Sequence, residues 1–179
     1  MTTFHLVRHG QPAWAMIDER CYTGGLIDLA PLTEVGRAEI DAAASRLLAW
    51  SPDVVLASPM TRALQSAVII GHRLGLAPVV ELDLHEWLPD LSGGAVTEAD
   101  VRAAYKDMEA CGGVWPAGTT RTWEPRPDVA KRVTAVLACY TAHERVAVIC
   151  HGVVIESLTG QRVPTGGGVD WSPSPAEPT

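Results

Sequence analysis

The chain has 179 residues, of which 47% are hydrophobic and 20% charged, and one domain of this size can bury a core without a disulfide or a bound metal. The chain has 14 lysine and arginine residues and 21 aspartate and glutamate residues. The resulting formal net charge of −7 argues against a general nucleic-acid-binding protein. The sequence has no basic start followed by an apolar segment and no long uncharged apolar run, so we expect neither a secretory signal nor a membrane partner. It also has no C-x-x-C pair, which argues against a zinc cluster or a disulfide framework. We therefore expect a reduced, cytoplasmic protein.

Short apolar runs alternate with amphipathic stretches along the first half of the chain. Residues 4–7 predict a strand, and residues 53–57 predict a strand buried on both faces. Between them, Thr33 is expected to cap a helix whose first turn holds Glu34, where the helix dipole favours a carboxylate. The apolar residues that recur at helical spacing in this helix are Ile40, Ala44, Leu47 and Leu48.

A second helix is expected after residues 53–57. Ser58 and Pro59 are predicted to begin it, with the proline at the first helical position, and Gly75 to end it. The residues predicted to share one face of this helix are Leu64, Val68 and Gly71. A third strand is expected over residues 79–82.

Residues 83–126 are rich in glycine, proline and tryptophan and carry one predicted helix, over residues 98–109. We interpret them as an excursion from the main sheet, acting as a lid or substrate segment. The pattern then predicts a helix, a buried strand, a short helix and a small last strand over residues 128–142, 146–150, 152–158 and 168–171. The proline-rich tail, residues 172–179, is expected to be disordered.

Strands that alternate with helices predict an α/β fold, namely a three-layer αβα sandwich around a mainly parallel central sheet. Near-continuous apolar runs such as VVLA and VAVIC are typical of strands covered on both faces. We therefore expect a single domain over residues 1–171.

Cationic residues follow three of the predicted strands. Arg8 and His9 come after the first, Ser58 and then Arg62 after the second, and His151 after the strand that ends at residue 150. Each alone is most often a surface charge or an ordinary hydrogen-bonding partner. Ligands of open α/β sheets, however, bind beyond the carboxyl ends of the strands, where all of these residues are expected. Because guanidinium forks and helix N-termini suit phosphate, the set predicts an anion site.

Four segments resemble, in the same order, segments of the histidine phosphatase superfamily, the phosphoglycerate-mutase-like proteins. Residues 6–11 (LVRHGQ) resemble its R-H-G signature, and residues 31–36 (PLTEVG) its PLTxxG segment. Residues 57–67 (ASPMTRALQSA) are similar to its SPxxRAxxTA segment with serine for the commoner threonine, and residues 150–152 (CHG) to its late SHG. The resemblance extends over residues 3–163.

This resemblance implies a metal-independent phosphomonoesterase that needs no cofactor. The acidic remainder of the chain disfavours polyanions and favours a small-molecule phosphate ester as the substrate. His9 would attack phosphorus and form a phosphohistidine. Arg8, Arg62 and His151 would bind the phosphoryl oxygens and stabilise the transition state, and water would then release phosphate.

The family takes its general acid from an L-x-E segment after the third strand, which residues 84–86 (LHE) fit best. The resemblance therefore implies Glu86 as the acid, although the usual glycine shortly after it is missing. Burial, helped by Trp87, would raise the pKa of Glu86 and keep it protonated. The nearby carboxylates that compete with it are Glu81, Asp83 and Asp90.

Other residues are candidates for substrate contacts. Gln11 follows the R-H-G directly, and Arg20 lies on the loop where the family often has a further phosphate contact, with a solvated arginine as an equal alternative. Three tryptophans fall in predicted loops, where they line a pocket or pack the excursion against the core: Trp14, Trp115 and Trp123.

Hydrolysis is favoured over mutase-type phosphoryl transfer because mutases of this superfamily are generally longer. A non-catalytic phosphate-binding or regulatory module is a third hypothesis, since the acid segment is the least regular part of the resemblance. The sequence does not indicate the substrate or the oligomeric state.

Overall fold

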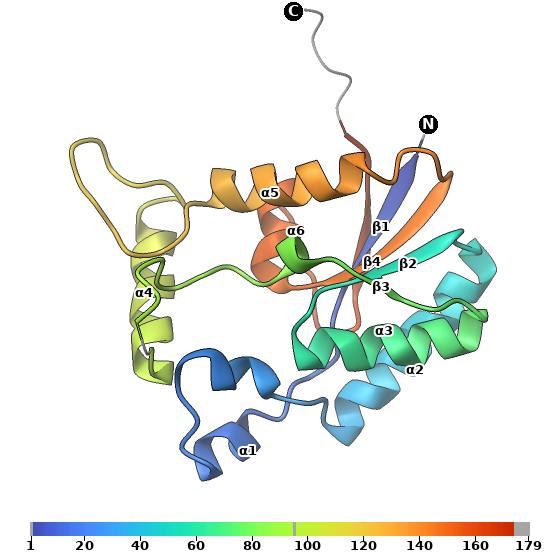
Figure 1. Cartoon of the computed structure of the whole chain (residues 1–179), viewed down its shortest axis with the longest axis horizontal. Coiled ribbons are helices and arrows are strands. Elements are labelled where there is room, and N and C mark those ends of the chain that lie inside the picture. The colour runs from blue at the N-terminus through green and yellow to red at the C-terminus, as the bar shows by residue number, and fades with distance from the viewer. Residues whose placement is uncertain (1, 95, 174–179) are drawn as a thin grey trace, which may run out of the picture.

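The computed structural model describes residues 2–94 and 96–173. Within them, five strands form one sheet of order β3-β2-β4-β1-β5 (Figure 1). The strands are β1 (Thr3–Arg8), β2 (Val54–Ala57), β3 (Val79–Val80), β4 (Arg145–Cys150) and β5 (Gly168–Trp171). All neighbouring strands run parallel except β5, which pairs with β1 in the antiparallel direction. The predicted, mainly parallel sheet is confirmed.

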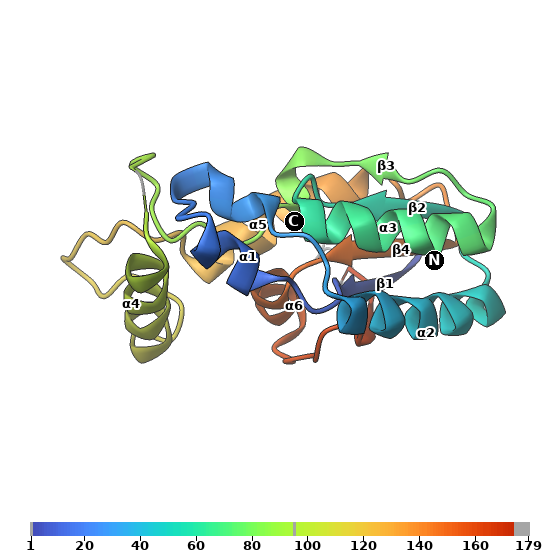
Figure 2. The ribbon, with the colours of Figure 1, turned by 90° about the horizontal axis from the view of Figure 1, so that it is seen from below.

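Helices cover both faces of the sheet. One pair, α2 (Glu34–Trp50) and α3 (Thr61–Leu74), packs on one face, and α5 (Arg126–Ala138) and α6 (Gly152–Thr159) pack on the other (Figures 1 and 2). The remaining helices, α1 (Trp14–Glu19) and α4 (Glu98–Ala110), lie beyond the carboxyl ends of the strands, together with the 3₁₀ turn η1 (Gly24–Leu29). A second 3₁₀ turn, η2 (Leu82–Leu84), follows β3 and packs against α5. The molecule is thus the expected three-layer sandwich, with a cover at one end.

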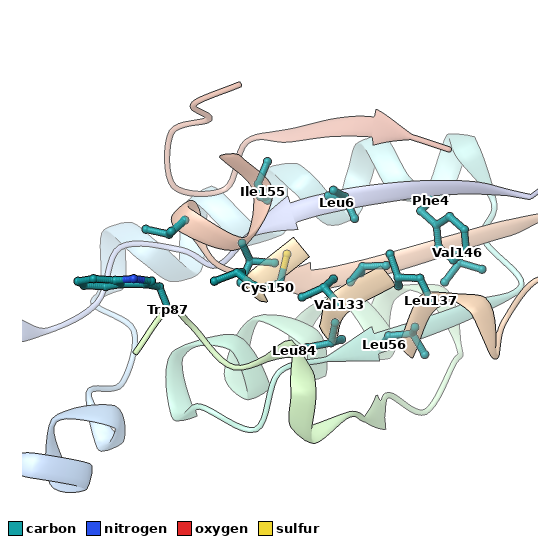
Figure 3. Close-up of a cluster of buried hydrophobic side chains, with 14 of the residues drawn as sticks. Phe4, Leu6, Leu56, Leu84, Trp87, Val133, Leu137, Val146, Cys150 and Ile155 are labelled. Carbon is teal, nitrogen blue, oxygen red and sulfur yellow. The ribbon is translucent and has the colours of Figure 1, made fainter. Parts of the chain in front are cut away.

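Strand β4 shows why the sheet is buried on both faces. Val146, Val148 and Cys150 enter the cluster under α5 and α6, while Ala147 and Ile149 enter the cluster under α2 and α3. All five are fully buried, because successive side chains of a strand point to opposite faces. Figure 3 shows the first cluster, with the Cys150 sulfur inside it and Trp87 at one end.

The helix termini follow local rules. The Thr33 hydroxyl accepts a hydrogen bond of 2.9 Å from the Gly36 amide and caps α2, as predicted. Gly75 ends α3 in the left-handed conformation, with φ of 70°. Helix α4 lies where the excursion was predicted to carry a helix, and Thr97 and Asp100 form a capping box at its start.

Several predictions about α3 and α2 were wrong. Helix α3 begins at Thr61 with Met60 as its N-cap, so Pro59 is not its first residue. Ser58 lies two residues before this N-cap, and its hydroxyl contacts the Met60 amide and His151 rather than an amide of the helix. Leu48, predicted to recur with the apolar residues of α2, and Val68, predicted to share a face with Leu64 and Gly71, are 53% and 60% exposed. The helices instead pack through stripes that contain small residues, including Ala43, Ala44, Ala63 and Ala67.

Other boundaries also differ. Strand β3 has two residues rather than four, and α5 covers residues 126–138 rather than 128–142. Trp14 begins α1 and is not in a loop. Most of the tail predicted to be disordered, residues 174–179, lies outside the described residues. In the part of the chain that the structure describes, no helix has the length and apolar character needed to cross a membrane.

Candidate active site

The carboxyl ends of β1, β2 and β4 border a cavity of about 770 Å³. Arg8 and His9 from the end of β1, Arg62 from the first turn of α3 and Glu86 from the segment after η2 all line it. His151, at the end of β4, is fully buried beside them, with its ring centroid 5.0 Å from that of His9. The structure therefore brings together the residues predicted at this edge.

Two glycines of the resembling segments explain how the chain leaves β1. A Cβ atom on Gly10 would lie 2.2 Å from the Gly36 carbonyl oxygen, and one on Gly36 would lie 2.3 Å from the Gln11 carbonyl oxygen. The segment after His9 thus runs directly against the first turn of α2, and only glycine permits this approach. The Gly10 amide also donates to the Ser66 hydroxyl at 3.2 Å, which ties the segment to α3.

A third glycine makes room for an arginine. A Cβ atom on Gly152 would lie 3.2 Å from Arg8 Cζ and 3.3 Å from Arg8 Nε. The guanidinium therefore lies against the backbone at the start of α6. Its Nη1 donates a hydrogen bond of 3.0 Å to the Val163 carbonyl, which fixes the orientation of the Arg8 side chain.

The surroundings of His9 keep its imidazole neutral. Its Nδ1 lies 2.8 Å from the Gly10 carbonyl oxygen, and because a carbonyl only accepts, the proton is on Nδ1 and the lone pair is on Nε2. Burial, together with the positive charges of Arg62 and Arg8, lowers the pKa of His9 to about 3 despite the Gly10 hydrogen bond. His9 is thus an uncharged base at neutral pH, with Nε2 as its nucleophilic atom.

Three groups hold the Arg62 side chain, which is almost fully buried. The Trp14 ring lies against its guanidinium, with Cζ 5.3 Å from the ring centroid. Asp28 approaches Nη1 at 3.5 Å, and Nη2 donates to the Met60 sulfur at 3.0 Å. Burial lowers the pKa of Arg62 and raises that of Asp28, but an arginine remains charged at neutral pH.

Buried nitrogens without a hydrogen-bond partner gather here. In the described residues, these side-chain atoms include Nε of Arg8, Nε of Arg62 and Nδ1 of His151. Each unsatisfied buried polar group costs about 1–3 kcal/mol, so native structures rarely leave several together without a ligand. The partners they lack are hydrogen-bond acceptors, such as the oxygens of a phosphoryl group.

His151 is fixed by Ser58. The Ser58 hydroxyl lies 2.7 Å from His151 Nε2 and also accepts a hydrogen bond from the Met60 amide at 3.3 Å. Because the hydroxyl already accepts from Met60, it can donate to Nε2 and leave the ring proton on Nδ1, the unpartnered atom. Burial and the charge of Arg62 lower the pKa of His151, which is therefore neutral.

Glu86 lies in the same cavity with its carboxylate held at both oxygens. Oε1 accepts a hydrogen bond of 2.9 Å from the Trp87 amide, and Oε2 accepts one of 3.3 Å from the Val153 amide in the first turn of α6. Burial nevertheless raises the pKa of Glu86, because desolvation outweighs these bonds and the attraction of Arg62.

The competing carboxylates lie in other environments. Glu81 accepts a hydrogen bond from the Tyr140 hydroxyl, and Asp83 is exposed. Asp90 lines the cavity, but the hydroxyl and amide of Ser92 hydrogen-bond to it and lower its pKa. Among the four, Glu86 alone combines a place in the cavity with a raised pKa.

A largely buried ion pair, which has no signal in the sequence, supports the segment around Glu86. Arg132 of α5 binds both carboxylate oxygens of Glu124, at 2.7 and 3.1 Å, and donates to the carbonyls of Asp83, His85 and Glu86. Glu124 in turn accepts from the Leu88 amide, and its carbonyl accepts from the Trp87 indole at 2.6 Å. No local sequence pattern indicates these contacts. Most of them join residues that are 36–49 positions apart, and the Arg132–Glu124 pair joins a helix to a loop.

Two predicted substrate contacts lie elsewhere. The Gln11 amide oxygen accepts a hydrogen bond of 2.8 Å from the Thr33 hydroxyl, and Arg20 lies over the Tyr22 ring at 5.9 Å. Neither lines the cavity. Within the described residues, no cluster of three or more histidine, cysteine, aspartate or glutamate side chains is placed to hold a metal ion.

Comparison with known proteins agrees with this geometry. The family model of the histidine phosphatase superfamily (branch 1) matches residues 4–166. The chain is 30% identical over 171 residues to the glucosyl-3-phosphoglycerate phosphatase of Mycobacterium tuberculosis, covering 86% of this chain and 72% of that protein. An uncharacterized phosphatase, PhoE, of Bacillus subtilis is 35% identical over 83 residues, which are 46% of this chain and 40% of that one.

Solved structures give the same result. The native structure of mycobacterial glucosyl-3-phosphoglycerate phosphatase has a TM-score of 0.67 at 26% identity and covers 94% of this chain and 86% of that one. A second structure, called mycobacterial hydrolase 2, has a TM-score of 0.68 at 25% identity, and the match covers 97% of this chain and 84% of that one. The chain belongs to the histidine phosphatase superfamily (branch 1), and it is a phosphatase.

Proposed function

We propose that this phosphatase hydrolyses a small phosphate monoester through a phosphohistidine on His9. The observation that carries the proposal is the combination of a neutral His9, whose Nε2 has a free lone pair, with the unpartnered donors of Arg8, Arg62 and His151 around it. A nucleophile beside donors without acceptors is the arrangement that in-line attack on a phosphoryl group requires.

In the first step, His9 Nε2 forms a bond to phosphorus while the bond from phosphorus to the ester oxygen breaks. Glu86 gives its proton to the departing oxygen and becomes a carboxylate. The raised pKa of Glu86 supports this role, since a carboxylic acid can donate only if it is protonated near the working pH. The products of this step are the free alcohol and the phosphorylated histidine.

In the second step, water attacks the phosphohistidine. The Glu86 carboxylate takes a proton from the water, the bond between Nε2 and phosphorus breaks, and inorganic phosphate leaves. His9 and Glu86 return to their starting states. In both steps Arg8, Arg62 and His151 Nδ1 would donate to the phosphoryl oxygens and stabilise the charge of the transition state.

Mutase-type transfer is the alternative, and it requires a second anionic group of the substrate to be bound in the same cavity. The lining offers little for such a group. Arg102 is paired with Glu98, and Arg162 with Glu109 and Glu156, which leaves Lys106 without an ion-pair partner among the described residues. This distribution favours hydrolysis of a monoester.

A phosphate-release assay over a panel of phosphate esters tests the proposal. The His9→Ala variant should lose turnover on every ester that the wild type hydrolyses. The expected loss is about 10³-fold or more, which is typical of removing a catalytic nucleophile. The matched control is His72→Ala, which removes an exposed histidine of α3 and should retain wild-type rates. Normal turnover by His9→Ala would contradict the proposal, and stimulation by a bisphosphate primer in a coupled assay would favour the mutase.

A further inference from the structure

Trp14 has an unusual environment for a large aromatic side chain. It is 42% exposed, whereas Trp87 and Trp123 are at most 5% exposed and the other three tryptophans are half-buried. Its exposed surface lines the cavity, while part of its ring rests on the Arg62 guanidinium. A tryptophan left open inside a cavity offers a flat apolar surface to whatever enters.

The position of Trp14 relative to the chemistry is defined by Arg62. In the proposed function the Arg62 guanidinium donates to phosphoryl oxygens, and the Trp14 ring packs against the same group, with its centroid 5.3 Å from Cζ. A group esterified to that phosphoryl therefore lies next to the indole ring. Trp14 thus borders the place of the leaving group and is not a distant part of the wall.

The other walls of this space are also largely apolar. They include Ile27 of η1, Leu88, Val101 and Tyr105 of α4, and Val163. Trp87 packs edge-on against Tyr105 with ring centroids 6.2 Å apart, which fixes the Tyr105 ring. Tyr105 lines the cavity, and its hydroxyl is a hydrogen-bonding group that can bind a polar substituent.

We propose, on the basis of the proposed function, that the substrate's leaving group carries a ring with a flat apolar face and that Trp14 is the residue that selects it by stacking. An aromatic ring and a pyranose ring both present such a face, so the shared chemistry is a ring with an apolar face that lies one or two bonds from the ester oxygen. An acyclic leaving group cannot cover the indole in this way.

The experiment compares kcat/KM for three esters: phenyl phosphate, a hexose phosphate and glycerol phosphate. Loss of Trp14 also loosens Arg62, but that effect acts on the phosphoryl group and is common to all three esters. The informative quantity is therefore the ratio of kcat/KM for a cyclic ester to kcat/KM for glycerol phosphate. Phenyl phosphate and the hexose phosphate distinguish an aromatic from a sugar ring.

We expect Trp14→Ala to lower this ratio about 3- to 10-fold for at least one cyclic ester, through KM more than through kcat, and Trp14→Phe to restore most of it. Trp50→Ala, which removes a tryptophan that lies against His5 and does not line the cavity, should leave the ratio unchanged. An equal loss for cyclic and acyclic esters would show that Trp14 only positions Arg62, and would overturn the inference. Failure of the wild type on all monoesters would instead refute the proposed function, and this inference with it.

Discussion

Replacing Gly152 by alanine should reduce activity without reducing stability. The added Cβ would lie 3.2 Å from Arg8 Cζ and 3.3 Å from Nε, where ordinary contacts begin near 3.4–4 Å, so the guanidinium must move by a few tenths of an ångström. A displacement of 1 Å at a catalytic group can cost about 100-fold in rate. We therefore expect kcat/KM to fall about 3- to 10-fold, equivalent to about 0.7–1.4 kcal/mol of transition-state stabilisation.

The stability effect has the opposite sign. Gly152 is the first residue of α6, where alanine is intrinsically better than glycine by up to about 1 kcal/mol. Steady-state phosphate release and thermal unfolding of the same preparation measure both quantities. Unchanged kcat/KM would refute the assigned contact between Gly152 and Arg8, and a matching fall in Tm would show that the loss of activity arises from unfolding.

Four further outcomes are expected. Gly10→Ala should destabilise the fold by more than about 2 kcal/mol, measured by denaturant unfolding, because its Cβ would meet the Gly36 backbone at 2.2 Å; a stable variant would contradict that packing. Glu86→Gln should lower kcat about 100-fold or more on alkyl phosphates, less on aryl phosphates with good leaving groups, and should remove the alkaline fall in rate that deprotonation of an acid with a raised pKa causes. Because the pKa of His9 is about 3, wild-type kcat/KM should not fall between pH 7 and pH 5 through protonation of this imidazole; a fall that follows an ordinary histidine pKa would refute the assignment. Arg132→Ala should destabilise the protein by about 3–5 kcal/mol, and the double variant Arg132→Met with Glu124→Gln should recover stability more than kcat, as expected if the ion pair positions Glu86; equal recovery of both would contradict that role.

The main elements of the fold could be predicted because their signals are local. The apolar runs of β2 and β4 identify strands buried on both faces, and the turn from each of these strands into a helix places Arg62 and His151 at one edge. Glycines at positions 10 and 36 also carry a local signal, although their mutual contact appears only when the chain is folded.

Features that depend on long-range contacts could not be predicted. The buried side of α2 contains Ala43 and Ala44, whereas Leu48 is exposed, and hydrophobicity alone ranks leucine above alanine. Serine is a residue type that commonly caps helices, but the Ser58 hydroxyl is hydrogen-bonded to His151, which lies 93 residues away in the sequence. The ion pair of Arg132 with Glu124 similarly has no signature in the sequence, since its role depends on the loop around His85, whose carbonyl accepts a hydrogen bond from Arg132.

The most direct test of the mechanism is to trap the phosphorylated enzyme. Wild-type protein mixed with a hydrolysable phosphate ester would be quenched under alkaline, denaturing conditions that preserve phosphohistidine, then digested and analysed by mass spectrometry. We expect one phosphoryl group on the peptide that contains His9 and no adduct in His9→Ala. The phosphoryl group should be attached at Nε2, because Nδ1 donates a hydrogen bond to the Gly10 carbonyl. Steady release of phosphate without any adduct on His9, together with activity in His9→Ala, would contradict the mechanism.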